Sequence, residues 1–182
     1  MIIKAYPCEG IKNNNKLIED IKIYQKNSPC CHNFPTCFHP RFQTDSLLHC
    51  SFPELELSYF DNLKKYLKDI QYSTNRADYK IVSFKMWAFI SKANEKSKQL
   101  QHRHALSKKN PLDISSLRYL TDTEIGTVFD FEYIQIHSKP KLNTWFFWPS
   151  ELWHSPEAAK VNKKERITLA TSIVLSLKSL KM

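Results

Sequence analysis

Three histidines and one arginine are the residues whose types and spacing could support chemistry. His102 and His104 are separated by one residue, His154 follows 50 positions after His104, and Arg166 follows 12 positions after His154. On a β-strand, residues i and i+2 project from the same face, so both imidazoles can reach one point in space while Arg103 turns away. Imidazole is a common ligand of transition metals. The pair therefore predicts a metal site, although a surface strand that carries two histidines has the same spacing.

His154 follows a strongly apolar segment. Trp145 to Trp148 reads as a buried strand that ends at Pro149, and a turn then leads to His154. A histidine in this place can close a metal site from a facing sheet. A structural histidine that is satisfied by local hydrogen bonds is the alternative interpretation.

The segment that begins at Arg166 alternates in character along a predicted strand. Its two faces carry Arg166, Thr168, Ala170, Ser172 and Val174 on one side and Ile167, Leu169, Thr171, Ile173 and Leu175 on the other. The apolar face is expected to pack on helices, and the face with smaller side chains leaves room for a ligand. Arginine beside a hydroxyl is suited to a bidentate grip on a carboxylate. A strand that starts with a solvated arginine is the alternative.

Together these segments resemble the iron(II)- and 2-oxoglutarate-dependent dioxygenase superfamily. That family has a His-x-acid pair, a distant histidine, and Arg-x-Ser/Thr about a dozen residues later. The resemblance is greatest to small phage and bacterial oxygenases in which His-x-His begins the site and Phe-Pro-Ser-x-Leu-x-His closes it. This chain has Trp148-Pro-Ser-Glu-Leu-Trp-His154 there, and Trp87-Ala-Phe-Ile and Leu117-Arg-Tyr-Leu are similar to the neighbouring strands. The resemblance covers about residues 80–177.

The resemblance implies a hydroxylase-type dioxygenase that uses iron(II), 2-oxoglutarate and O₂, with ascorbate allowed as a reductant. It implies His102, His104 and His154 as the catalytic metal ligands. The far carboxylate of the 2-oxoglutarate cosubstrate would pair with Arg166, assisted by Thr168 and Tyr119. It leaves the substrate open among a protein side chain, a nucleobase and a small metabolite.

Position 104 departs from the usual pattern of two histidines and one carboxylate. Either His104 is a third imidazole ligand, or it lies outside the ligand sphere and a carboxylate or water completes the site. Glu124 and Asp122 are the acids considered for that role, without a spacing argument for either.

The predicted elements place helices first and strands afterwards. Apolar spacing predicts helices over 15–26 and 53–72, and a short strand over 2–6. Further strands are expected at 79–90, 99–106, 116–121, 127–137, 144–148 and 166–177. This order indicates an α+β protein with an antiparallel sandwich or barrel. The resemblance specifies a double-stranded β-helix, or jelly roll, over 79–182, with the helices of 1–78 packed on one sheet in a single structural domain.

Composition excludes several classes of function. The chain has 182 residues and only 2 glycines, so glycine-rich phosphate loops are absent. It shows no signal peptide and no apolar run of the roughly 20 residues that a membrane helix needs, which favours a soluble cytoplasmic protein. The formal net charge of +9 suits an anionic partner. Nucleic acid is one candidate, but the lysines beside the predicted metal strand are equally typical of solvated loops.

Two other functions remain open from the sequence. Cys30, Cys31, Cys37 and Cys50, with neighbouring histidines, contain enough soft ligands for a structural zinc in an interaction module, although the spacing matches no familiar zinc finger. Free buried cysteines are the simpler interpretation. The third possibility is a jelly-roll protein with a three-histidine metal site, either a dioxygenase that uses no 2-oxoglutarate or a metal-binding protein without catalysis.

Overall fold

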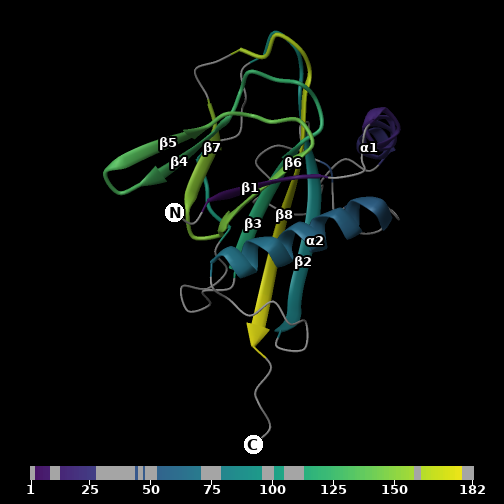
Figure 1. Ribbon diagram of the computed structural model, residues 1–182. Helices are drawn as coiled ribbons and strands as arrows, with labels where there is room; N and C mark the ends of the chain where they lie inside the picture. The colour runs from purple at the N-terminus through teal and green to yellow at the C-terminus, as the bar shows by residue number, and fades with distance from the viewer. Residues whose placement is uncertain are drawn as a thin grey trace, which may run out of the picture.

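The computed structural model describes residues 3–8, 13–27, 44, 47, 53–70, 79–95, 101–104, 113–157 and 161–177. Within these ranges the chain forms mostly antiparallel β-sheet, with two helices (Figure 1). The five-stranded sheet has the order β1-β6-β3-β8-β2, and the three-stranded sheet has the order β5-β4-β7. The larger sheet contains β1 (Lys4–Pro7), β2 (Tyr79–Ser91), β3 (Asp113–Tyr119), β6 (Thr144–Pro149) and β8 (Arg166–Leu177). The smaller contains β4 (Thr127–Phe131), β5 (Ile134–Ser138) and β7 (Trp153–Pro156).

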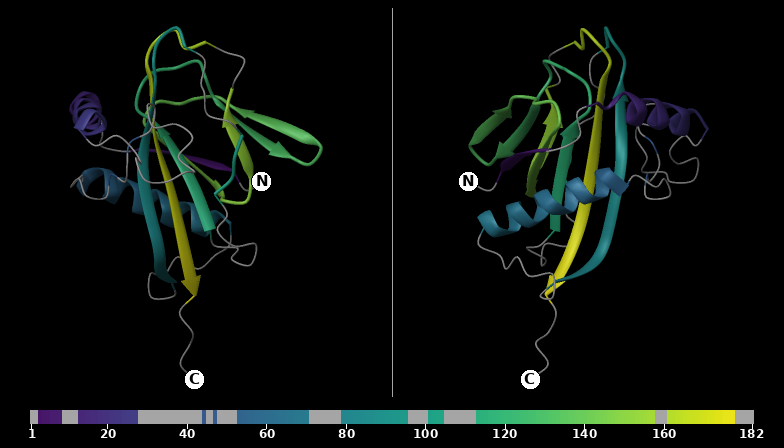
Figure 2. Two further views of the ribbon diagram at one scale, coloured as in Figure 1. Left: turned by 180° about the vertical axis from the view of Figure 1, so that it is seen from behind. Right: turned by 45° about the vertical axis from the view of Figure 1, so that its right-hand side comes forward.

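Helix α2 (Pro53–Asp69) lies across the outer face of the larger sheet, as the right view of Figure 2 shows. Its buried side chains recur every three or four residues, which gives it one apolar stripe. Glutamates in its first turn and Lys68 in its last turn complement the helix dipole. The stripe packs on the outer face of the larger sheet, where Tyr59 contacts the rings of Trp145 and Phe147 in β6. The same core contains Leu55, Tyr59, Leu63 and Tyr66 from α2 and Ile167, Leu169, Ile173 and Leu175 from β8. The apolar face of β8 is therefore buried in a core that it shares with a helix, as expected.

A second apolar cluster lies between the two sheets. The larger sheet contributes Leu117, Tyr119 and Trp148, and the smaller sheet contributes Phe129. All four side chains are buried. Neighbouring residues of a strand point to opposite faces. Strand β3 therefore contributes Leu117 and Tyr119 to this cluster and Ile114 to the outer core, the apolar cluster between the larger sheet and the helices. The two sheets therefore face each other, and aromatic side chains fill part of the space between them. Helix α1 (Asn15–Asn27) contributes the buried Ile21 to the outer core.

Residues 101–104 extend the edge of the smaller sheet beside β7. The amide of His102 donates to the carbonyl of His154 at 3.0 Å, and the amide of His154 donates back at 2.9 Å. The amide of His104 donates to the carbonyl of Ser150 at 3.0 Å. Main-chain pairing therefore holds both halves of the predicted metal motif in one sheet.

Some predicted boundaries were wrong. The segment 127–137, expected to be one strand, is a hairpin of β4 and β5 with its turn at Glu132 and Tyr133. The turn expected after Pro149 is present at residues 150–152, and the residues around His154, for which no strand was expected, form β7. The helix predicted over 53–72 ends at Asp69, and β3 begins at Asp113, before the expected 116. Of the strand predicted over 99–106, only residues 101–104 lie in the described part of the chain. No helix among the described residues is long and apolar enough to span a membrane.

Candidate metal centre

The side chains of His102, His104 and His154 converge on one point. One nitrogen of each ring lies within 4.8 Å of the others. The ring centroids of His102 and His154 are 4.4 Å apart, and His104 lies 4.8 Å from His102 and 5.2 Å from His154. Within the described ranges, no carboxylate or thiol joins this group. Arg103 is exposed on the opposite face, over the ring of Trp153, as the strand alternation predicts.

Burial keeps the imidazoles of His104 and His154 neutral. Burial lowers the pKa of His104 to about 3, and the neighbouring His154 and His102 add to the effect. Burial likewise lowers the pKa of His154 to about 3, with His102 as the second cause. Nδ1 of His154 lies 2.9 Å from the carbonyl oxygen of Leu152, which can only accept, so this nitrogen carries the ring proton. Nε2 of His154 is then left with a free lone pair, the state that a metal ligand requires.

Aromatic rings surround the three histidines. Trp148 of β6 contacts His154 edge to face at 4.9 Å between centroids, and Trp87 of β2 lies 5.4 Å from His104. Phe129 packs on Trp148 at 5.0 Å. These rings restrict how the imidazoles can turn and keep one side of the cluster apolar. A metal bound there would have a dry wall on that side.

Arg166, at the start of β8, is buried to 1% exposure. Its Nε–H donates to the carbonyl oxygen of Ile125 at 3.4 Å, and its guanidinium lies 5.5 Å from the centre of the Tyr119 ring. Burial lowers the pKa of Arg166, and the contact with Tyr119 opposes this shift. No acidic side chain of the described chain pairs with this guanidinium. A buried positive charge without a counter-ion is unfavourable, and an anionic ligand can compensate it.

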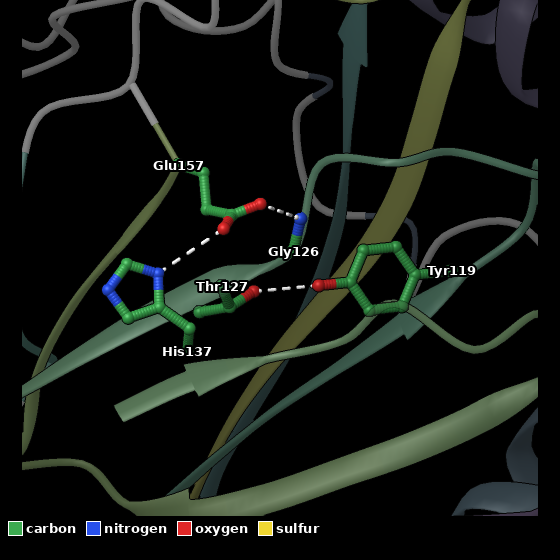
Figure 3. A network of polar contacts seen from close by, with 5 residues as sticks. All are labelled: Tyr119, Gly126, Thr127, His137 and Glu157. Carbon is green, nitrogen blue, oxygen red and sulfur yellow. Dashed lines mark hydrogen bonds and ion pairs between the residues drawn. The ribbon is translucent and has the colours of Figure 1, made fainter. Parts of the chain in front are cut away.

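Thr168 and Tyr119 lie beside Arg166 and are cross-strand neighbours in β8 and β3. The hydroxyl of Tyr119 is 2.8 Å from Oγ1 of Thr127 (Figure 3). Thr168 is fully buried, and its hydroxyl has no hydrogen-bond partner. The structure therefore brings together the three residues that the sequence assigned to carboxylate binding.

Sequence reasoning missed a polar contact that holds the start of β4. The carboxylate of Glu157 accepts the amide of Gly126 at 2.9 Å and lies 3.2 Å from Nδ1 of His137, as Figure 3 shows. Gly126 directly precedes Thr127. The contact with Glu157 therefore fixes the start of β4, where the hydroxyl of Thr127 meets that of Tyr119. One signal was present in the sequence, because Gly126 is one of only 2 glycines. Its partner lies 31 residues away and could not be identified.

A partly open cavity is lined by both the three histidines and Arg166. Besides these residues it is lined by side chains of both sheets, among them Phe89, Ser115, Leu117, Trp148 and Ala170. None of the described residues that line it is acidic. The three histidines and Arg166 therefore face one common space, whereas Thr168 and Tyr119 are not among the described residues that line it.

The two acids that were considered as metal ligands in place of His104 lie elsewhere. Glu124 is exposed and pairs with Lys163 at 2.9 Å, and Asp122 is also exposed. Neither belongs to the histidine cluster. Cys30, Cys31, Cys37 and Cys50, the ligands of the zinc hypothesis, lie outside the described residues.

No family model matches the sequence, and no curated protein matches it. Solved structures do match. A prolyl-4-hydroxylase from Pseudomonas putida is 10% identical with a TM-score of 0.61, over 94% of this chain and 91% of that one. A nickel complex of the non-heme monooxygenase ThoJ is 10% identical with a TM-score of 0.62, over 96% and 75%.

A viral collagen prolyl hydroxylase from Paramecium bursaria Chlorella virus-1 is 15% identical with a TM-score of 0.55, over 96% of this chain and 90% of that one. The same viral enzyme in a structure described as a 2-oxoglutarate complex matches equally well. At these identities the likeness concerns the fold. The protein shares the fold of prolyl hydroxylases and related non-heme oxygenases, and it carries a three-histidine cluster compatible with the metal site that the sequence predicted.

Proposed function

We propose that this protein is an iron(II)- and 2-oxoglutarate-dependent dioxygenase of the hydroxylase type. The observation that carries the proposal is one cavity that is lined by three converging imidazoles and by a buried arginine without a counter-ion among the described residues. The first group suits a transition metal, and the second suits a carboxylate. An iron(II) ion and a dicarboxylate cosubstrate require this combination.

The donor set fits the metal. Imidazole nitrogen suits iron, and His102, His104 and His154 each direct one ring nitrogen toward a common point. We assign all three as ligands. The hydrogen bond from Nδ1 of His154 to Leu152 supports this role, because such a bond fixes the ring orientation of a ligand. When bound, the iron supplies the oxygen-activating chemistry.

The remaining residues bind, orient and exclude water. Arg166 binds the far carboxylate of 2-oxoglutarate, whose charge compensates the buried guanidinium. The unpaired hydroxyl of Thr168 donates to the same carboxylate, and Tyr119 holds the guanidinium in place through its ring. Trp148 and Phe129 keep bulk water from the histidine side of the cavity.

We propose further that the core is a double-stranded β-helix. The order of strands along the chain supports this, because successive strands alternate between the two sheets. Strand β2 is in the larger sheet, residues 101–104 lie beside the smaller, and β3 is in the larger. Strands β4 and β5 are in the smaller sheet, β6 in the larger, β7 in the smaller and β8 in the larger. Strand β1 pairs with β6, and α2 packs on the same sheet. Residues 1–78 and 79–182 then belong to one domain.

The direct test is anaerobic titration of the metal-free protein with iron(II) and 2-oxoglutarate. A weak visible charge-transfer band should appear only when both are present, and succinate should form when oxygen is admitted. Arg166→Gln should lose the band at moderate 2-oxoglutarate and still bind iron. Wild-type protein that shows neither band nor succinate would end the proposal.

A second function is favoured by one observation, the absence of a carboxylate from the described histidine cluster. A three-histidine centre could serve a dioxygenase that uses no 2-oxoglutarate, or a metal-binding jelly roll without catalysis. These alternatives predict iron binding that 2-oxoglutarate does not perturb. The same titration therefore separates them from the main proposal.

A further inference from the structure

The cavity of the proposed oxygenase has more positive charge than one cosubstrate can compensate. A divalent metal would bring two positive charges, the three imidazoles bring none, and the Arg166 guanidinium brings one. The 2-oxoglutarate dianion cancels two of these three. In the usual site a carboxylate ligand cancels the last one. Here position 104 is histidine, and the cavity lining has no acidic residue in the described part of the chain.

An uncompensated charge in a buried site is strongly unfavourable, so the loaded cavity favours a further anion. One hydroxyl of the cavity lining, that of Ser115, is paired with the hydroxyl of Ser150 behind it. Oγ of Ser115 and Oγ of Ser150 are 2.8 Å apart, and both side chains are at most 1% exposed. The amide of His104 donates to the carbonyl of Ser150, which places the pair next to this histidine.

The serine pair has a proton to spare. One hydroxyl donates to the other, and the second proton must point elsewhere. Ser115 lines the cavity, so it can accept from Ser150 and donate its own proton into the cavity. Trp148 also lines the cavity, and its buried indole N–H has no acceptor. Ser115 and Trp148 are cross-strand neighbours, so their side chains lie on the same face of the larger sheet.

This group of donors is separate from the Arg166 end. Tyr119, which contacts Arg166, lies four residues beyond Ser115 on β3, a distance of about 13 Å along a strand. Ala170, rather than a polar residue, lies between the two ends on β8. An anion held by Arg166 therefore leaves the Ser115 donors unused.

We propose that the cavity binds a second, singly charged anion beside the metal, held by Ser115 and Trp148, and that the substrate supplies it as a carboxylate. This inference rests on the proposed function and gives it a substrate class, a carboxylic acid. A free halide is the other source of the same charge. The +9 net charge of the chain would draw either anion toward the protein.

The test uses the full chain loaded with cobalt(II), whose visible absorption reports changes at the metal. Acetate and chloride are each titrated into the cobalt protein with 2-oxoglutarate present, without oxygen, and with perchlorate holding the ionic strength constant. We expect a saturable spectral change with acetate at millimolar concentration. Acetate binding more tightly than chloride supports a substrate carboxylate. Chloride binding alone overturns the carboxylate assignment.

Three variants decide the assignment of residues. Ser115→Ala and Trp148→Phe should each weaken acetate binding about tenfold, and Ser83→Ala, at the far end of β2, should not. His104→Asp should abolish acetate binding while it keeps cobalt, because its carboxylate supplies the missing charge. No saturable change in wild-type protein, or equal affinity in His104→Asp, would overturn the inference. Failure of the proposed function looks different, because 2-oxoglutarate itself would then leave the cobalt spectrum unchanged.

Discussion

His102 and His154 exchange two main-chain hydrogen bonds, at 3.0 and 2.9 Å, and their imidazole rings lie 4.4 Å apart. Residues 52 positions apart in the sequence are therefore held together by sheet pairing, whether or not a metal is bound. Pairing of this kind preorganises a site, because the backbone and not the ligand fixes the distance between the two side chains.

The preorganised site leads to a prediction about metal stoichiometry. His102→Ala and His154→Ala should each lose at least 90% of bound iron(II) at micromolar protein, because two imidazoles hold a divalent ion far less tightly than three. His137→Ala is the matched control, since His137 is exposed and outside the cluster. Metal analysis after desalting provides the measurement. Full iron occupancy in His154→Ala would mean that the cluster is not the metal site.

Acid should destabilise the metal-free protein through His104 and His154. Both have a pKa of about 3 when folded and about 6.5 when unfolded, so below pH 6.5 only the unfolded chain takes up these protons. The free energy of unfolding therefore falls as the pH drops from about 7 toward 3. One unit below 6.5, the loss is about 1.4 kcal/mol per histidine, or about 3 kcal/mol for both.

Urea unfolding at pH 7.5 and 5.5 in the presence of a chelator measures this difference. In His104→Gln the loss between the two pH values should be roughly halved, because one titrating group is removed. The same pH dependence in this variant as in wild-type protein would show that other groups cause the effect.

Substitution of Arg166 should separate cosubstrate binding from metal binding. Arg166→Lys keeps the charge but loses the planar fork that grips a carboxylate, and Arg166→Gln loses both. We expect 2-oxoglutarate affinity to fall about 10-fold and about 100-fold respectively, of the size expected for charged hydrogen bonds. Iron affinity should stay within about twofold. Calorimetry with each ligand provides the check, and loss of iron in both variants would assign Arg166 a structural role instead.

Some of the site could be read from the sequence because its signals are local. The alternation of apolar and smaller or polar side chains in β8 predicted its two faces, and the predicted bounds of 166–177 agree with the structure. The spacing of His102 and His104 gave a shared face, because a strand has a period of two residues. The long-range partners had no such signal. Strand β7 has four residues and ends in proline, which is too short for a periodic pattern, so the sequence does not predict it.

The hairpin of β4 and β5 illustrates the same limit. Its turn at Glu132 and Tyr133 contains none of the glycine, asparagine or proline residues that mark tight turns, so the segment read as one strand. The role of Glu157 could not be predicted from the sequence either, because its contacts with Gly126 and His137 form only when β7 lies beside β4. Tertiary pairing, and not local propensity, creates these features.

Gly126 leads to a stability prediction. A Cβ at this position would collide with the carbonyl oxygen of Ser138, a backbone atom that cannot move without disturbing β5. Gly126→Ala should therefore lower the free energy of unfolding by about 3 kcal/mol, the upper end of the usual cost of overpacking. Lys139→Ala, an exposed position in the following loop, is the control. Chemical denaturation of both proteins tests this, and a loss of under 1 kcal/mol in Gly126→Ala would contradict the close approach.

A last prediction concerns Arg118, which is fully buried beside the larger sheet. Its Nη2 donates to Oδ1 of Asn14 and to Oδ1 of Asn143, both at 2.9 Å, and Asn143 has a φ of 53°. Asn143→Ala removes an acceptor from a buried charge and places alanine in a left-handed conformation, which together should cost about 3 kcal/mol.

Two further substitutions at Asn143 divide that cost. Asn143→Gly tolerates the positive φ and loses only the acceptor, so it should be more stable than Asn143→Ala by about 1 kcal/mol. Asn143→Asp keeps an acceptor and adds a charge opposite to that of Arg118, so it should be at least as stable as wild-type protein at pH 7. Urea denaturation of all three variants gives the order. An Asn143→Asp protein that is less stable than Asn143→Gly would show that the buried arginine does not require this acceptor.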